Sequence, residues 1–250
     1  MRTLILTTLA LCLSLFPRES AAITGGDPAT PKDYLIRVGL CTGALISERL
    51  IVTAAHCVHN TPVNLITLKR MNGTYLRQKQ RVIIHPDYEG WNQSAVKRND
   101  IALIVLDEEI EVTPLTIPLE NTSQSVSLAG WGKREDGSYP RIPFEIAQLP
   151  LLPHYAHSFW DNNIDLLISD DEAQDFEASF FSGDFLAIRV TEGKSACRGD
   201  SGAPVIGDQG ELVGIVSHGQ DDCVNQEVFF ITDISQYTGW ISHVEETIHE

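Results

Sequence analysis

The sequence has 250 residues, of which 43% are hydrophobic and 21% charged, and its formal net charge at pH 7 is −16. Such an acidic surface repels phosphate backbones and anionic lipids, so the composition argues against binding to nucleic acids or membrane surfaces. It favours cationic partners only weakly, because a solvated acidic coat explains the same charge.

The first 22 residues form a leader typical of exported proteins. Arg2 supplies a positive start, an apolar run follows from Leu4 to Phe16, and Ser20-Ala21-Ala22 offers small residues to signal peptidase. The apolar run is too short to span a bilayer, and no later stretch is long enough to anchor the chain. We therefore expect a signal peptide at residues 1–22 and a secreted, soluble protein at residues 23–250.

Short apolar runs separated by Gly, Pro, Asn and Asp predict an all-β protein with the regular strand spacing of a sandwich or barrel. The predicted strands are residues 38–40, 50–52, 65–68, 81–84, 101–106, 126–129, 185–190, 212–216 and 228–231. Helical periodicity is clear only at the C-terminus, where Tyr237, Ile241, Val244 and Ile248 fall on one face. This pattern predicts a terminal helix that docks on the core.

Two further segments bear on domain organisation. Residues 114–124 contain two prolines and no strand pattern, so they suit a linker between an N-terminal half, about 23–120, and a C-terminal half, about 121–250. Residues 154–183 crowd Asp and Glu among Phe and Trp. Carboxylates of this kind could hold calcium, but they show no regular ligand spacing, which favours a solvated loop-and-helix excursion.

Four cysteines remain after the leader, and an even number in an exported chain predicts two disulfides. They are Cys41, Cys57, Cys197 and Cys223. Their spacing alone leaves all three pairings open. Asn72, Asn92 and Asn121 each begin an N-glycosylation sequon.

Three stretches carry candidate chemistry. Ser201 lies in Gly199-Asp-Ser-Gly, where the glycines permit a sharp turn that presents the hydroxyl and aims amide N–H groups at one point. An apolar strand ends in Thr-Ala-Ala-His-Cys and delivers His56, and Asp100 sits at the mouth of a buried strand. Each alone has a structural explanation as a turn residue or a core histidine. Together they favour nucleophilic catalysis, because a serine hydroxyl needs a neighbouring base.

At these motifs the chain resembles the chymotrypsin-like (trypsin-fold) serine endopeptidases, which carry their catalytic residues in the order His, Asp, Ser. Other matching motifs extend over nearly all of residues 23–250, although residues 144–192 match poorly. They are Ile23-Thr-Gly-Gly, His85-Pro-Asp-Tyr, Ala129-Gly-Trp-Gly and the segment from Tyr237 to Ile241 with Trp240. The resemblance implies an all-β fold of two six-stranded antiparallel β-barrels with a C-terminal α-helix. It also implies an active site between the barrels and a reaction that needs no cofactor and no metal.

The resemblance assigns a role to each residue of the constellation. His56 would be the general base, Asp100 would orient it, and Ser201 would be the nucleophile. The backbone N–H groups of Gly199 and Ser201 would form the oxyanion hole. Ser217 matches the family serine whose hydroxyl supports the aspartate.

The same resemblance implies that Cys41 pairs with Cys57 and Cys197 with Cys223. It also implies that a free ammonium at Ile23 forms a salt bridge with Asp200 and thereby orders the site. Ala21-Ala22 stands where most relatives carry a basic residue for an activating protease. We therefore expect signal peptidase itself to expose Ile23 without a separate zymogen step, the alternative being trimming of a short pro-segment.

The resemblance places the specificity pocket at Ser195, Ser217, Gly219 and Glu227. It does not settle which substrate residue the pocket prefers. Ser195 stands at the pocket base in place of the aspartate of trypsin, which argues against cleavage after Lys or Arg alone. Gly219 leaves one wall open to a large side chain. If Glu227 points inward, its carboxylate favours a basic or mixed aromatic-basic residue; if outward, an apolar or aromatic one.

Three departures from the family pattern are Thr24, Ala203 and His218, which we expect to affect subsite preference or rate rather than activity itself. The resemblance implies protein or peptide substrates, protein protease inhibitors as further partners, and a monomer. A protease-like binding or inhibitor module without activity, and a serine esterase, are the competing interpretations. The presence of His56, Asp100 and Ser201 favours the endopeptidase over both.

Overall fold

A computed structural model describes residues 23–76, 80–88, 90, 98–152, 185–191, 193–219 and 223–248. The strands are β1 (Asp27–Pro28), β2 (Leu35–Val38), β3 (Cys41–Leu45), β4 (Leu50–Thr53), β5 (Leu68–Arg70), β6 (Tyr75–Leu76), β7 (Gln80–Ile84), β8 (Ala102–Leu106), β9 (Ser125–Gly130), β10 (Phe144–Leu152), β11 (Phe185–Arg189), β12 (Pro204–Ile206), β13 (Leu212–Gly219) and β14 (Val228–Asp233). The helices are α1 (Ala55–Val58), two 3₁₀ turns at Val63–Leu65 and Ile234–Tyr237, and α4 (Thr238–Thr247). The predicted signal peptide, the 154–183 excursion and the Asn92 sequon lie outside the described residues.

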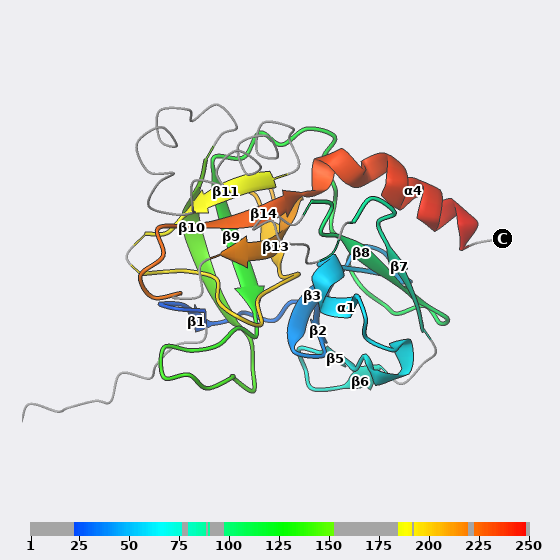
Figure 1. Cartoon of the computed structure of the whole chain (residues 1–250), viewed down its shortest axis with the longest axis horizontal. Helices are drawn as coiled ribbons and strands as arrows, with labels where there is room; N and C mark the ends of the chain where they lie inside the picture. Colours follow the sequence, from blue (N-terminus) through cyan, green and yellow to red (C-terminus); the bar gives the residue numbers. More distant parts are fainter. Residues whose placement is uncertain are drawn as a thin grey trace, which may run out of the picture.

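The strands form two antiparallel sheets that lie side by side (Figure 1). One sheet has the order β1-β10-β11-β14-β13-β12-β9, and an additional pairing of β9 with β10 closes six of these strands into a barrel. β1 is a two-residue strand paired with β10 outside that circuit. The predicted six-stranded C-terminal barrel is therefore present, and the start of the described chain lies against it.

The other sheet comes earlier in the chain, has the order β6-β5-β2-β3-β4-β8-β7 and is built from residues 35–106. We call it the first sheet, and the sheet that contains β9 to β14 the second sheet or second barrel. β4 pairs with β8 over four residues, from Leu50 opposite Val105 to Thr53 opposite Ala102. Both strands are completely buried along their length, which fits their continuous apolar sequences. The two sheets together give the two barrels or half-barrels that the resemblance implies, although this sheet has seven strands where six were expected.

The C-terminal helix α4 lies over the first sheet although it follows the last strand of the second (Figure 1). Ile241 and Val244 on its inner face pack with residues of both sheets, among them Leu103 and Leu212. The predicted docking of this helix is confirmed. Its position joins the two sheets along one side, because a single apolar cluster includes side chains from both.

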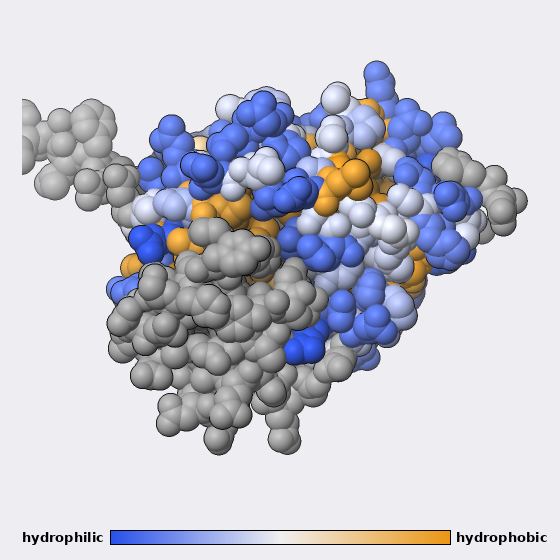
Figure 2. All heavy atoms as spheres, turned by 90° about the horizontal axis from the view of Figure 1, so that it is seen from above, coloured by the Kyte–Doolittle hydropathy of each residue, from blue (hydrophilic) through white to orange (hydrophobic). Residues whose placement is uncertain are grey.

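One face of the molecule is mostly hydrophilic. Seen from above, the coloured residues are mostly hydrophilic, and hydrophobic side chains occur in separate small areas (Figure 2). Within the described parts of the chain, no helix is long and apolar enough to cross a membrane.

Two strand predictions were wrong. Of residues 38–40, Val38 ends β2, whereas Gly39 and Leu40 form the turn between β2 and β3, with Gly39 at φ +59° and Leu40 72% exposed. Residues 65–68 divide between the end of a 3₁₀ turn and the start of β5. In both places the apolar run continues through a change of backbone direction, which composition alone does not reveal.

Candidate active site

His56 and Asp100 approach each other because β4 and β8 are antiparallel neighbours. Thr53, the last residue of β4, pairs with Ala102, the first residue of β8. His56 follows Thr53 by three residues and Asp100 precedes Ala102 by two, so both leave the sheet at the same end. The intervening Ala54 and Ala55 are fully buried, and their small side chains allow α1 to begin directly at the strand end.

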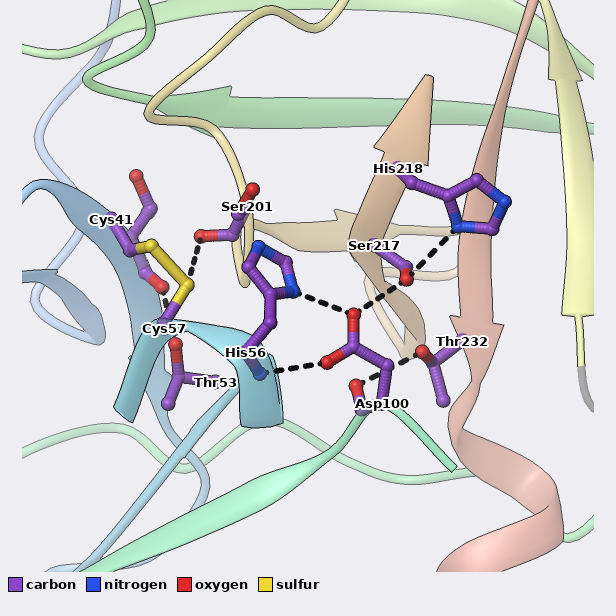
Figure 3. Close-up of polar contacts among 10 residues, drawn as sticks. Cys41, Thr53, His56, Cys57, Asp100, Ser201, Ser217, His218 and Thr232 are labelled. Atoms are coloured by element: carbon purple, nitrogen blue, oxygen red, sulfur yellow. Dashed lines mark hydrogen bonds and ion pairs between the residues drawn. A yellow bond between two sulfur atoms is a disulfide. The ribbon is translucent and has the colours of Figure 1, made fainter. Parts of the chain in front are cut away.

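Asp100 holds His56 by two hydrogen bonds (Figure 3). The imidazole Nδ1 lies 2.7 Å from Asp100 Oδ2, and the backbone N–H of His56 donates to Asp100 Oδ1 at 2.9 Å. Asp100 is fully buried, whereas the His56 side chain is 12% exposed. An acceptor at Nδ1 places the proton of a neutral imidazole there, which leaves Nε2 as an acceptor toward the other side of the ring.

Other polar groups complete the environment of Asp100. Ser217 Oγ donates to Asp100 Oδ2 at 2.6 Å, and Thr232 Oγ1 donates to the Asp100 carbonyl at 3.1 Å. Burial alone would raise the pKa of Asp100, but the charge on His56 and the hydrogen bonds from His56 and Ser217 outweigh it and hold that pKa below 3.8. The carboxylate is therefore ionised at neutral pH and stabilises a charged imidazole.

His218 extends this group of hydrogen bonds. Its Nδ1 lies 3.2 Å from Ser217 Oγ, and its ring stacks on Phe230 with centroids 4.9 Å apart. Because the Ser217 hydroxyl donates to Asp100, its oxygen is left to accept from His218. His218, one of the departures from the family pattern, thus contacts Ser217, which in turn donates to Asp100 (Figure 3). Sequence reasoning missed this contact.

Ser201 lies on the opposite side of the His56 ring from Asp100 (Figure 3). Its turn depends on the two flanking glycines, which have φ values of +101° at position 199 and +77° at position 202. Residues other than glycine rarely adopt such backbone angles. At Gly202 a Cβ would also collide with the Thr53 hydroxyl and with backbone atoms of Thr42 and Ala54. The turn is therefore closely packed against the first sheet.

One residue of the first sheet holds this turn in place. Thr42 in β3 donates its backbone N–H to the Ser201 carbonyl at 2.9 Å and its hydroxyl to the Gly199 carbonyl at 3.0 Å. Thr53, three residues before His56, donates its hydroxyl to the Thr42 carbonyl at 2.8 Å. The candidate nucleophile and base are thus connected across the two sheets by hydrogen bonds.

Asp200 is fully buried behind Ser201. Its carboxylate accepts backbone N–H groups of Gly132 at 2.7 Å and Cys197 at 2.9 Å. Burial raises the pKa of Asp200 from 3.8 to about 7, although the two hydrogen bonds act in the opposite direction. Ile23 is also fully buried, within the core of the second barrel, and the next residue, Thr24, pairs with Ser195.

Both disulfides have the pairings that the resemblance implies. Cys41 at the start of β3 is bonded to Cys57, the residue after His56. Cys197 is bonded to Cys223 and so joins the segment before Ser201 to the loop before β14. His56 lies close to the sulfurs of Cys41 and Cys57, but both sulfurs are committed to the disulfide and cannot act as thiolate ligands for a metal.

The pocket positions have different environments. Ser195 is fully buried and Ser217 almost so, whereas Glu227 is exposed. Gly219 pairs with Phe229 across β13 and β14. Sequence reasoning did not include Phe229 or Gln226, which is only 3% exposed. The pairing of β13 with β14 would have placed Phe229 beside Gly219 if its register had been known. No sequence signal shows that Gln226 is the buried residue and Glu227 the exposed one.

Two of the three sequons lie within the described residues. Asn72 is exposed, Asn121 is partly exposed, and the Oδ1 of each accepts the backbone N–H of the residue two positions on, at 3.0 Å in both cases. These are Asx turns at the surface, and they leave each Nδ2 atom, the glycan attachment point, unused by that bond.

The trypsin family model matches residues 23–241, which is most of the chain. This chain belongs to the trypsin family. Snake venom serine proteinase 14 from Crotalus adamanteus is 31% identical over 252 residues, covering 94% of this chain and 92% of that protein. A trypsin from Phaedon cochleariae is 28% identical, covering 90% of this chain and 88% of that protein.

A solved structure gives the same fold. It is described as neuropsin, a serine protease expressed in the limbic system of mouse brain, and matches with a TM-score of 0.70 at 21% identity, covering 88% of this chain and 99% of that one. At that identity the likeness shows the fold alone. The relatives by sequence are named serine proteinases and trypsins. This trypsin-family chain is accordingly a serine endopeptidase that acts on proteins or peptides.

Proposed function

We propose that the protein is a secreted serine endopeptidase that uses Ser201 as nucleophile, His56 as general base and Asp100 as the group that orients the base. The observation that carries the proposal is the 2.7 Å contact between His56 Nδ1 and Asp100 Oδ2. It fixes the tautomer in which Nε2 can take a proton, with Ser201 on that side of the ring (Figure 3).

The reaction follows from these placements. Ser201 Oγ attacks the substrate carbonyl carbon while its proton moves to His56 Nε2, and the carbonyl oxygen becomes an oxyanion that the N–H groups of Gly199 and Ser201 stabilise. Collapse of this intermediate breaks the C–N bond, and His56 gives the proton to the departing amine. Water then attacks the acyl carbon while His56 takes its proton, and the ester C–O bond breaks as His56 gives that proton to Ser201 Oγ, which releases the acid and restores Ser201.

Exposure of Ile23 by signal peptidase is the proposed route to the active form. The ammonium of Ile23 would pair with the Asp200 carboxylate, whose pKa is raised by burial, and would favour its ionised form. N-terminal sequencing of the secreted protein should give Ile-Thr-Gly-Gly. A mature chain that begins upstream of Ile23 would defeat this route.

For the residue preceding the cleaved bond, the exposed side chain of Glu227 supports the apolar or aromatic preference over the mixed aromatic-basic one. Ser195 supports the same choice, because a serine at the pocket base offers no charge to a Lys or Arg side chain.

Export by the signal peptide at residues 1–22, glycosylation at the sequons and a monomeric state complete the proposal. The two disulfides support export, since disulfides persist in oxidising compartments. The separated hydrophobic areas on the face in Figure 2 support a monomer. Protein inhibitors that present a peptide loop to the same site are the further proposed partners.

The deciding experiment compares secreted wild-type protein with Ser201→Ala. A small organophosphorus fluoride should add its phosphoryl mass to wild type at Ser201 and not to the variant, and only wild type should cleave a mixed peptide library. Asn72→Gln, at an exposed sequon on the first sheet, provides a control that should cleave as wild type does. Absence of serine-dependent labelling and cleavage would instead favour the inactive binding module.

A further inference from the structure

The space beside Gly219 is filled from the opposite strand. Gly219 on β13 pairs with Phe229 on β14, and directly paired residues in an antiparallel sheet project their side chains from the same face. Phe229 is only 1% exposed and belongs to the core of the second barrel. A Cβ at position 219 would lie 3.2 Å from the Phe229 Cβ, so the open wall that glycine provides faces an aromatic residue rather than an empty slot.

Gln226 occupies the remaining space. Its side-chain amide Nε2 donates to the Ser195 hydroxyl and, at 2.7 Å, to the Ala196 carbonyl. Its Oε1 lies 2.5 Å from the position that a Cβ on Gly219 would take. The amide therefore extends from the 195–196 segment to β13, the two walls between which a substrate side chain would enter.

The hydrogen bonds at the base of this space are satisfied internally. Ser195 is fully buried, and its hydroxyl accepts from Gln226 and donates to the Ala196 carbonyl at 3.1 Å. Withdrawing the amide would remove one hydrogen bond from each of these two buried groups and leave them only the bond to each other. Lost hydrogen bonds between buried polar groups are destabilising, so the inward position of Gln226 is the favoured one.

The same residues connect this space to the reaction centre. Ser195 and Ala196 lead directly into Cys197, which starts the turn that presents Ser201. Ser217, two residues before Gly219 on β13, donates a hydrogen bond to Asp100. The resemblance places the side chain that precedes the cleaved bond between the 195–196 segment and Gly219, where Gln226 lies.

We propose that Gln226, backed by Phe229, closes the specificity pocket, so that the enzyme cleaves after residues with small side chains such as Gly, Ala and Ser. The proposal rests on the proposed function, because it concerns the pocket of that same site. It narrows the apolar preference to small residues, since a Phe or Tyr side chain would have to occupy the volume of the Gln226 amide. Packed protein interiors do not admit such overlap without displacement.

The test uses secreted, mature protein and a series of peptide substrates that are identical except at the residue before the cleaved bond, which is Ala, Val, Leu, Phe or Arg. For wild type, kcat/KM should be at least tenfold higher with Ala than with Phe or Arg. Gln226→Ala should raise the Phe-to-Ala ratio of kcat/KM at least tenfold, since single methylene groups in a pocket already change selectivity by about tenfold or more. Gln226→Asn, which keeps a shorter buried amide, should give an intermediate ratio.

Asn225→Ala is the matched control, because Asn225 is the exposed neighbour of Gln226 in the same loop, and its ratio should equal that of wild type. Titration with a small organophosphorus fluoride, which carries no side chain into the pocket, counts the functional Ser201 sites in each preparation and corrects for misfolded variant. Cleavage after Phe or Arg by wild type as efficient as after Ala would overturn the proposal, as would an unchanged ratio in Gln226→Ala. Failure of wild type to react with the fluoride would refute the proposed function itself.

Discussion

The buried Asp200 carboxylate gives a pH-dependent prediction about the free energy of unfolding. In a chain where Ile23 is preceded by Ala22, no ammonium is available to Asp200, and burial raises its pKa from 3.8 to about 7. Between these two values the unfolded carboxyl is ionised while the folded one keeps its proton. Because the folded state then binds more protons, its stability falls as pH rises through this window and is constant again above about 7.

The size of the effect follows from the shift. Each pKa unit corresponds to about 1.36 kcal/mol, so the Ala22-extended chain should lose about 4 kcal/mol of unfolding free energy between about pH 4 and pH 7. In a chain that begins at Ile23, the α-ammonium has an ordinary pKa of about 8 and is charged throughout that range. An ion pair with Asp200 should then remove most of the loss.

The assay is denaturant unfolding of both chains under non-reducing conditions at several pH values from 4 to 7.5. Asp200→Asn in the Ala22-extended chain is the control that isolates the carboxyl, and its stability should vary less with pH than that of its parent. The difference in slope matters rather than the absolute stability, because the asparagine amide cannot accept both N–H groups. Parallel pH curves for the extended chain and its Asp200→Asn variant would refute the assignment of this titration to Asp200.

Three further predictions concern the site. Asp100→Asn should lower kcat about 10⁴-fold with little change in stability, because an amide can place the His56 proton on the wrong nitrogen; steady-state kinetics corrected by fluoride titration will measure this. Ser217→Ala removes a hydrogen bond to a buried carboxylate, worth about 1.5–3 kcal/mol, so the unfolding free energy at neutral pH should fall, and its further loss in acid should become smaller as the pKa of Asp100 rises toward its unfolded value. Gly202→Ala should sharply reduce secretion yield and melting temperature, since both its φ angle and its contacts exclude a Cβ. A melting temperature equal to that of wild type would contradict the last of these.

The parts of the site that the sequence predicts best are those defined by short local motifs. His56, Asp100 and Ser201 each belong to a stretch in which the strand end or turn is encoded within about eight residues. Their meeting then depends on the pairing of β4 with β8, which two strongly apolar runs specify clearly.

The pocket could not be predicted in the same way because its occupants depend on side-chain direction. Glu227 was one of four expected pocket residues, with its direction left open; it is exposed, whereas its neighbour Gln226 is buried. Adjacent residues in extended chain point to opposite sides, so an uncertainty of one position in a resemblance exchanges the inward residue for the outward one. The place of Phe229 beside the pocket could not be predicted for the same reason, because it depends on which residue of β13 lies opposite it.

The sequence analysis did not predict β10, for a related reason. β10 contains Pro150 and a register shift between Ile146 and Leu149, with Gln148 at φ +60°. This irregularity breaks the period-2 alternation that identifies a half-buried strand. The strand forms because its two edges pair with different partners, β9 on one side and both β1 and β11 on the other, which are contacts distant in sequence.

The division of the site between two sheets makes Thr42 important for its geometry. If only apolar packing joined the barrels, a small shift between them would change the separation of His56 and Ser201, because the two residues belong to different sheets. Thr42 is fully buried and donates to the carbonyls of Gly199 and Ser201, while its own carbonyl accepts the Thr53 hydroxyl. Hydrogen bonds have narrower distance and angle limits than apolar contacts. β3 and β4 of the first sheet therefore help to set the position of the nucleophile relative to the base, together with β13 of the second sheet, where the Val216 carbonyl accepts the Gly202 N–H.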